Sequence, residues 1–114
     1  MHVTRRDEAP RYEAPGHDRM TMCRLQGREA GPSSAMWLGL SVIEPGGGTT
    51  LDASAQEKMY VVLEGEVTMM SETGEALLRP LDSCRFAPGE GRRLLNRSTR
   101  PATVLLAMSL AAIR

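Results

Sequence analysis

The sequence has no long apolar run and no excess of charge of either sign. Its 114 residues include 14 basic and 14 acidic side chains, so the formal net charge is zero, with a pI of about 6.7. A balanced charge gives no overall field that attracts polyanions, and no run reaches the ~18 apolar residues that a membrane span requires. We therefore predict no nucleic-acid partner, no membrane partner and a cytoplasmic location.

Cysteine and histidine are also scarce. Cys23 and Cys84 lie far apart and form neither a CxxC pair nor a disulfide-rich spacing, which argues against a cysteine-based zinc or redox site. The two histidines, His2 and His17, lie near the N-terminus, and we expect His17 to be a solvent-exposed loop residue. A chain of this length forms one domain with a single core.

The sequence does contain a series of short apolar runs separated by turn residues. Residues 1–19 carry Pro10, Pro15 and Gly16 among charges, which is typical of an extended arm. The apolar runs cover residues 20–25, 36–43, 59–70, 76–78, 83–87, 94–96 and 102–110. Short strands with glycine, proline and aspartate breaks indicate an all-β sandwich or barrel. We predict an all-β fold with an N-terminal arm over 1–19 and one β-barrel domain over 20–114.

The stretch from Gly46 to Gly65 has a characteristic spacing. Five residues separate Gly46 from Asp52, Ser54 follows two positions later, and three residues then lead to Lys58, six residues before Gly65. This spacing resembles the first motif of the cupin family, which has two histidines and a glutamate at the three inner positions. The resemblance implies a cupin-type jelly-roll β-barrel in which Asp52, Ser54 and Lys58 replace residues that hold a metal in family members.

A second stretch, residues 82–96, resembles the second cupin motif. It keeps Pro88 and Asn96 but has a shifted glycine. Counting forward from Pro88 places the fourth ligand position at Arg93, whereas counting back from Asn96 places it at Arg92. In either case an arginine stands where the family has a histidine.

These substitutions argue against a bound metal. Metal sites of this kind need neutral imidazoles and a carboxylate at about 2.0–2.2 Å from the ion, and the cations of Lys58 and an arginine would repel it. Asp52 alone cannot hold a transition metal against water. We therefore predict no metal and no other cofactor, and rank metal-dependent dioxygenase chemistry third among the possible functions.

The resemblance also implies which side chains face the barrel lumen. These are Asp52, Ser54, Lys58, Tyr60, Asn96 and either Arg92 or Arg93. Cations that are partly desolvated by apolar walls attract a carboxylate, a phosphate or an enolate-like oxygen. We predict that the barrel binds a small, anionic, acidic or carbonyl-bearing metabolite in an accessory or sensing role. The other interpretation is an internal ion pair between a carboxylate, Asp52 or Glu57, and one of these cations.

A second class of function is a metal-independent isomerase, epimerase or lyase. In such an enzyme Lys58 and an arginine would stabilise an oxyanion while Tyr60 or Asp52 moves a proton, so Tyr60 and Asp52 are the candidate catalytic residues. No histidine stands at a motif position, and we therefore favour binding over catalysis.

Two segments carry more apolar side chains than one barrel interior needs. Residues 60–63 are apolar in succession, and residues 102–113 contain few polar side chains. A strand that is apolar on both faces is buried on both faces. We therefore predict a homodimer that covers this surplus, as the resemblance to cupins also implies.

Overall fold

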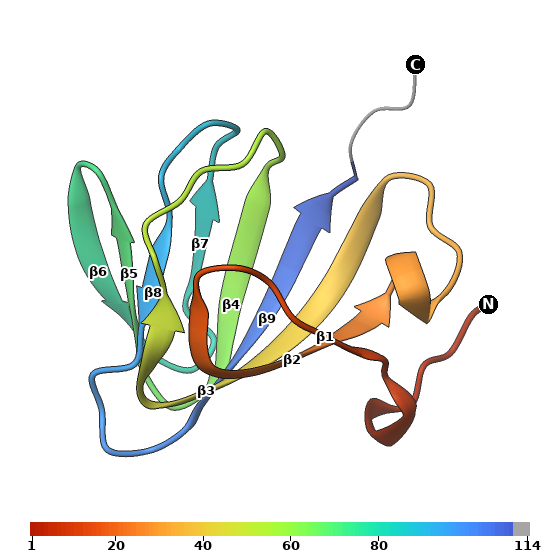
Figure 1. Ribbon diagram of the computed structural model, residues 1–114, viewed down its shortest axis with the longest axis horizontal. Helices are drawn as coiled ribbons and strands as arrows, with labels where there is room; N and C mark the ends of the chain where they lie inside the picture. Colours follow the sequence, from red (N-terminus) through yellow and green to blue (C-terminus); the bar gives the residue numbers. More distant parts are fainter. Residues whose placement is uncertain (111–114) are drawn as a thin grey trace.

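The computed structural model describes residues 1–110, and they form β-strands with only two short 3-10 turns (Figure 1). The strands are β1 (Arg11–Tyr12), β2 (His17–Gln26), β3 (Met36–Thr49), β4 (Lys58–Glu64), β5 (Val67–Ser71), β6 (Gly74–Leu78), β7 (Ser83–Phe86), β8 (Arg93–Leu95) and β9 (Ala102–Ser109), and the turns are η1 (Arg6–Glu8) and η2 (Arg28–Ala30). The prediction of an all-β jelly-roll barrel is confirmed. None of the helical segments within residues 1–110 has the length and apolar character to cross a membrane.

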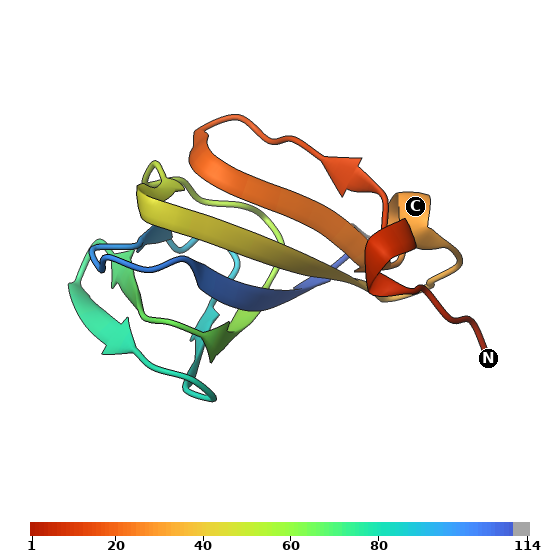
Figure 2. The same cartoon turned by 90° about the horizontal axis from the view of Figure 1, so that it is seen from below.

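Strand β3 belongs to both walls of the barrel. Its residues 36–43 pair with β9 on one edge, while Gly48 near its end pairs with Leu95 of β8. Its other edge pairs with β2. The strand order is β6-β5-β8-β3-β9-β4-β7, with β2 added to β3 and β1 added to β2. Figure 2 shows the resulting curved walls, which form a nearly closed antiparallel barrel.

Glycines allow β3 to contribute to both walls. At Gly48 the backbone runs so close to β8 that an added Cβ would collide with the carbonyl oxygen of Leu94. Gly46, which follows Pro45, has a φ of 80°, in the left-handed region that glycine adopts without a steric penalty. A side chain at Gly48 would therefore force the two strands apart.

Side chains alternate between the core and the outer surface along each strand. On β4, Val62 is fully buried whereas Met59 is 48% exposed. Because successive residues of a strand point to opposite faces, Lys58 and Tyr60 lie on the same inner face as Val62. This alternation directs Lys58 and Tyr60 to the interior of the barrel.

The segment before residue 20 is more structured than an extended arm. Strand β1 pairs with β2, and β2 begins at His17. Gly16, with a φ of 72°, lies in the turn between them. In Figure 1 this turn passes in front of β4 and β9. The domain boundary at residue 20 stays a prediction, and residues 111–113 of the predicted apolar run lie outside the described residues.

Candidate functional site

A pocket of about 300 Å³ lies between the N-terminal hairpin and the inner faces of β4 and β9. Five of the side chains named from the sequence line it: Asp52, Ser54, Lys58, Tyr60 and Arg92. A cavity of this volume is at the lower end of the range for small-molecule sites. The structure thus brings most of the predicted site residues together.

Arg92, and not Arg93, is the arginine of this pocket. Arg92 is 7% exposed, whereas Arg93 is an exposed residue that lines a separate depression with His17 and Leu95. An isolated bridge pairs Arg92 with Asp52. This pairing fixes the register, and alternation along the strand then directs Arg93 to the other face.

Asn96 does not line the pocket. It is fully buried, and its side-chain amide donates hydrogen bonds to the carbonyl oxygens of Ile43 and Arg100, both at 2.8 Å. Its side-chain oxygen accepts hydrogen bonds from the backbone and the hydroxyl of Ser98. Asn96 therefore ties the loop after β8 to β3, and we leave it and Arg93 out of the site.

Lys58 is the most buried cation of the pocket, with 5% of its surface exposed. Burial, and secondarily the positive charge of Arg92, lower the pKa of its amine to about 8, while the nearby Asp52 carboxylate acts in the opposite direction. Burial and a neighbouring cation both make an amine harder to charge. The neutral form of the Lys58 amine therefore becomes abundant only from about pH 8 upward.

Tyr60 stands two residues along the same strand and is 7% exposed. Burial raises the pKa of its hydroxyl to about 12, although the charge of Arg92 partly offsets this effect. Its ring meets Phe86 edge to face, with centroids 6.0 Å apart. Tyr60 thus keeps its proton and offers the pocket a hydrogen-bond donor.

The internal ion pair considered from the sequence does not form within residues 1–110. Asp52 takes part in no ion pair there, and its Oδ1 accepts a hydrogen bond from the backbone N–H of Ala53. Ser54 donates its hydroxyl proton to the carbonyl oxygen of Gln56. Lys58 and Arg92 therefore face the pocket without a neutralising partner among the described carboxylates.

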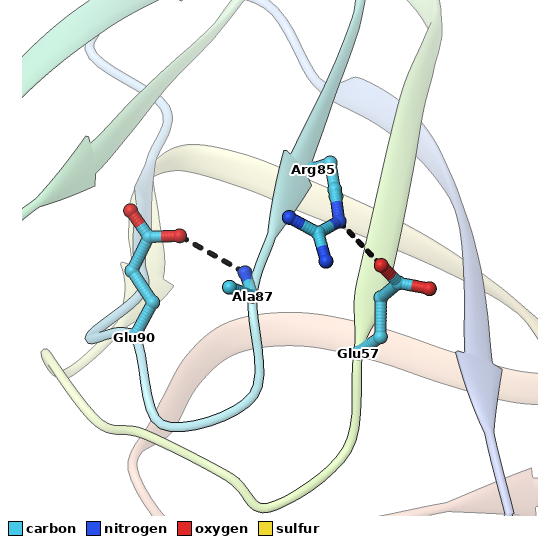
Figure 3. A network of polar contacts seen from close by, with 4 residues as sticks. All are labelled: Glu57, Arg85, Ala87 and Glu90. Carbon is cyan, nitrogen blue, oxygen red and sulfur yellow. Dashed lines mark hydrogen bonds and ion pairs between the residues drawn. The ribbon is translucent and has the colours of Figure 1, made fainter.

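Glu57 lies on the outer side of the barrel. It forms an ion pair with Arg85 of β7, and Figure 3 shows this pair beside the loop in which Glu90 accepts a hydrogen bond from the backbone of Ala87. The one-residue offset between Glu57 and Lys58 sends their side chains to opposite faces. Glu57 is consequently not a pocket residue.

Residues that precede the two motifs also line the pocket, from β1, β2, η2 and the start of β3. The guanidinium of Arg24, on β2, lies 3.4 Å from the centroid of the Tyr12 ring and 4.1 Å from that of Trp37. Arg28 lies 5.7 Å from the Trp37 ring, and Glu13 also lines the pocket. None of these residues belongs to the site predicted from the motifs. The scarcity of aromatics was a usable signal, because Tyr12, Trp37 and Tyr60 all line the pocket.

The expectation that His17 is a solvent-exposed loop residue was wrong. His17 is the first residue of β2, pairs with Thr49 of β3 and lines the pocket. Burial lowers the pKa of its imidazole, opposed by a 2.8 Å hydrogen bond from Nδ1 to the carbonyl oxygen of Pro15. The strand pairing draws this histidine against the barrel, which its charged local sequence did not indicate.

Three residues that line the pocket each carry a buried donor atom without a hydrogen-bond partner. Within residues 1–110, three buried side-chain polar atoms have none, and they are Nε of Arg24, Nε1 of Trp37 and Nε of Arg92. Nε of Arg24 lies 3.4 Å from a Glu29 oxygen, but without hydrogen-bond geometry. All three residues line the pocket. Buried polar groups are normally hydrogen-bonded, but these three atoms are themselves shielded from solvent, so a ligand reaches them only after a side-chain movement.

The residues at the four motif positions do not fit a divalent metal. Two are the cations Lys58 and Arg92, and the carboxylate of Asp52 is the one anionic group among the four. Among residues 1–110 no three His, Cys, Asp or Glu side chains gather as metal ligands. Transition metals bind imidazole, thiolate and carboxylate donors, and this set offers the carboxylate of Asp52 alone.

Comparison with known proteins agrees with the fold. The cupin domain family profile matches residues 39–108. A protein of Mycobacterium tuberculosis named beta-D-galactosidase is 43% identical over 109 residues, which cover 96% of this chain and 94% of that protein.

Two solved structures show the same architecture. One, titled a sugar phosphate isomerase from a cupin superfamily, comes from Silicibacter pomeroyi and has a TM-score of 0.75 and 27% identity over 90% of this chain and 70% of its own. The other, the polyketide cyclase RemF of Streptomyces resistomycificus, has a TM-score of 0.84 and 18% identity over 96% of this chain and 79% of its own, which shows the fold alone. From the profile match and the 43% identical relative, this chain belongs to the cupin domain family.

Proposed function

We propose that this cupin binds a small sugar-derived metabolite that carries a carboxylate or phosphate group. The observation that carries the proposal is that two buried cations, Lys58 and Arg92, line one pocket and form no ion pair with a carboxylate within residues 1–110. Four cationic side chains line this pocket against two carboxylates: the cations are Arg24, Arg28, Lys58 and Arg92, and the carboxylates are Glu13 and Asp52. An anion with several acceptor oxygens complements such a wall.

Physical chemistry favours an acceptor-rich ligand here. A buried cation without a partner carries the cost of its desolvation, and an anionic ligand oxygen placed against it offsets part of that cost. A guanidinium matches the two oxygens of a carboxylate or phosphate in a bidentate arrangement. Arg92, buried and free of carboxylate partners within residues 1–110, is the side chain that we expect to hold the anionic group.

The sugar part of the proposal is supported by the comparisons. One relative is named a galactosidase and one structural neighbour is titled a sugar phosphate isomerase. Tyr12 and Trp37 also line the pocket, but the guanidinium of Arg24 lies over both rings. The names of the relatives therefore carry this part of the proposal.

The proposal is tested by thermal shift with matched pairs of sugars. We expect D-galacturonate and galactose 6-phosphate to raise the melting temperature in proportion to their occupancy, and D-galactose to raise it far less. Arg92→Gln should weaken galacturonate binding about tenfold or more, because a charge-assisted hydrogen bond contributes about 1.5–3 kcal/mol. Arg93→Gln, which removes the neighbouring exposed arginine, is the matched control and should leave the affinity unchanged.

Either of two results would contradict the proposal. Equal stabilisation by galactose and galacturonate would show that the pocket does not select an anion. Equal weakening by Arg92→Gln and Arg93→Gln would show that the effect is one of overall charge and does not come from the pocket.

Catalysis is the second candidate function. It is favoured because a cation and two proton-exchanging side chains line the same pocket. Lys58, Tyr60 and Asp52 line one pocket, so a cation that stabilises an oxyanion stands with two groups able to exchange protons, as a metal-independent isomerase, epimerase or lyase requires. The galactosidase name of the relative adds a hydrolytic variant, for which Glu13 and Asp52 would be the two carboxylates. Release of nitrophenol from nitrophenyl β-D-galactoside tests this variant, and Asp52→Asn should abolish it.

A further inference from the structure

Lys58 is the only lysine in the chain, and every other basic residue is an arginine. Arginine remains charged at any pH that a protein tolerates, whereas a lysine amine can lose its proton and become a nucleophile. The one position with a primary side-chain amine is therefore also the most buried cation of the pocket. A purely electrostatic role would be filled equally well by another arginine.

The environment of Lys58 differs from that of the arginines on the outer surface. Arg79, Arg85 and Arg97 each form an ion pair with a glutamate. Lys58 forms no ion pair and no side-chain hydrogen bond within residues 1–110, although its side chain lines the pocket. Its amine is thus not committed to the protein and remains available to a ligand.

Burial and the charge of Arg92 keep the pKa of this amine near 8. A lysine that is desolvated, or that lies next to another cation, is an activated nucleophile toward carbonyl groups. The same two causes, burial and a neighbouring cation, are both present here.

We propose that Lys58 forms an imine with the carbonyl carbon of the bound metabolite. This inference rests on the proposed function and makes it more specific, because the ligand class becomes a small aldehyde or ketone that also carries an anionic group. Arg92 would hold the anion, and the carbonyl carbon would then lie against Nζ of Lys58.

The step balances without an oxidant or reductant. The lone pair of Nζ bonds to the carbonyl carbon, the carbonyl π electrons move to its oxygen, and that oxygen takes up a proton while the nitrogen loses one, giving a carbinolamine. The hydroxyl group then leaves as water after a second protonation, and the nitrogen lone pair forms the C=N bond. Tyr60 lies on the same strand face as Lys58, and its hydroxyl, with a pKa of about 12, can donate the proton that the carbonyl oxygen takes up. The carboxylate of Asp52 can accept the proton that the amine loses.

Reductive trapping tests the inference directly. The full chain is incubated with sodium cyanoborohydride and one of four carbonyl compounds, the anionic pyruvate or D-galacturonate and their uncharged analogues acetone or D-galactose. Adducts on the peptides that contain Lys58 and the N-terminal amine are quantified by mass spectrometry. Since Lys58 is the only lysine, the N-terminal amine is the one other primary amine and serves as an internal reference.

At each amine we compare the amount of adduct formed with the anionic compound and with its uncharged analogue. We expect this ratio to be about tenfold larger at Lys58 than at the N-terminal amine, because only a compound bound at Lys58 also makes a charge-assisted contact with Arg92. Arg92→Gln should remove this excess preference, and Arg93→Gln should keep it. An equal preference at both amines, or no adduct on Lys58 with either anionic compound, overturns the inference.

Thermal shift of the wild type with galacturonate separates this inference from the proposed function. Lys58→Arg has no amine that can form an imine, so it should give no trapped adduct in the pocket. If the wild type binds galacturonate and is not trapped, the imine is refuted and the proposed function stands. If the wild type does not bind galacturonate, the proposed function itself has failed.

Discussion

Asp52 and Arg92 exchange two backbone hydrogen bonds, from the N–H of Asp52 to the carbonyl oxygen of Arg92 at 3.0 Å and from the N–H of Arg92 to that of Asp52 at 2.8 Å. The two residues are forty positions apart in the chain, yet this bridge fixes them side by side. It joins the two motif regions at the wall of the pocket. The side-chain chemistry of the site is therefore set by a main-chain contact that no side-chain substitution at either position removes directly.

The network around Asn96 should be important for stability and unimportant for binding. Asn96 is fully buried and its side chain takes part in four hydrogen bonds, to Ile43, Arg100 and Ser98. Asn96→Ala leaves these partners unsatisfied, and we expect it to lower the free energy of unfolding by about 2–4 kcal/mol. Urea denaturation measures this loss. If galacturonate affinity fell as well in the folded variant, Asn96 would have a role in the site that its position does not indicate.

Lys58 should make stability depend on pH in a defined direction. The amine releases its proton near pH 8 in the folded chain but near its ordinary value of 10.5 in the unfolded chain. Between these values the unfolded state binds more protons, so the free energy of unfolding rises with pH. Below pH 8 the folded protein must keep a buried charge.

Lys58→Met removes that charge while keeping a similar side-chain volume. We expect the variant to be more stable than the wild type near pH 7, and the difference to shrink steadily from about pH 8 toward 10.5. Denaturant titrations of both proteins at pH 7, 8.5 and 10 measure the difference, in which contributions from other titrating groups cancel. A difference that stays constant with pH would show that the Lys58 amine is not perturbed by folding.

Trp37 should report on binding through its fluorescence. It is the single tryptophan of the chain, it lines the pocket, and its ring lies 4.1 Å from the guanidinium of Arg24. An anion bound near Arg24 changes the field at the indole, so we expect galacturonate to change the emission in a saturable way. Trp37→Phe should abolish the signal while thermal shift still detects binding. Binding without a change in emission would place the ligand away from this wall.

The outer face of the barrel should form the surface of a homodimer. Leu40, Leu105 and Val61 lie beside one another on β3, β9 and β4, and alternation turns Leu105 and Val61 away from the pocket. We propose that this apolar row pairs with its copy, so that light scattering gives about twice the 12.4 kDa of one chain.

Leu105→Glu should then give the mass of a single chain, because two desolvated carboxylates would face each other across the interface. Leu81→Glu is the matched control, since Leu81 is 79% exposed and lies in the turn between β6 and β7. If the wild type has the mass of one chain, or if both variants dissociate alike, the proposed surface is wrong.

The sequence by itself determined the barrel and one side of its pocket. The spacing from Gly46 to Gly65 is local, and along a single strand alternation fixes which side chains share a face. Lys58 and Tyr60 could therefore be placed correctly, and the same rule excludes Glu57 once the inner face is known.

Only the tertiary structure decided which residues complete the pocket around Lys58 and Tyr60. Arg92 was distinguished from Arg93 by a pairing across forty residues, and Arg24 and His17 reached the pocket through the pairing of β2 with β3. Register between strands that are distant in the chain depends on how all of them close into the barrel, and no local pattern encodes it. The motif spacing predicted cations in the lumen but left open an internal ion pair, and it is the barrel that holds Lys58 and Arg92 without a neutralising partner among residues 1–110.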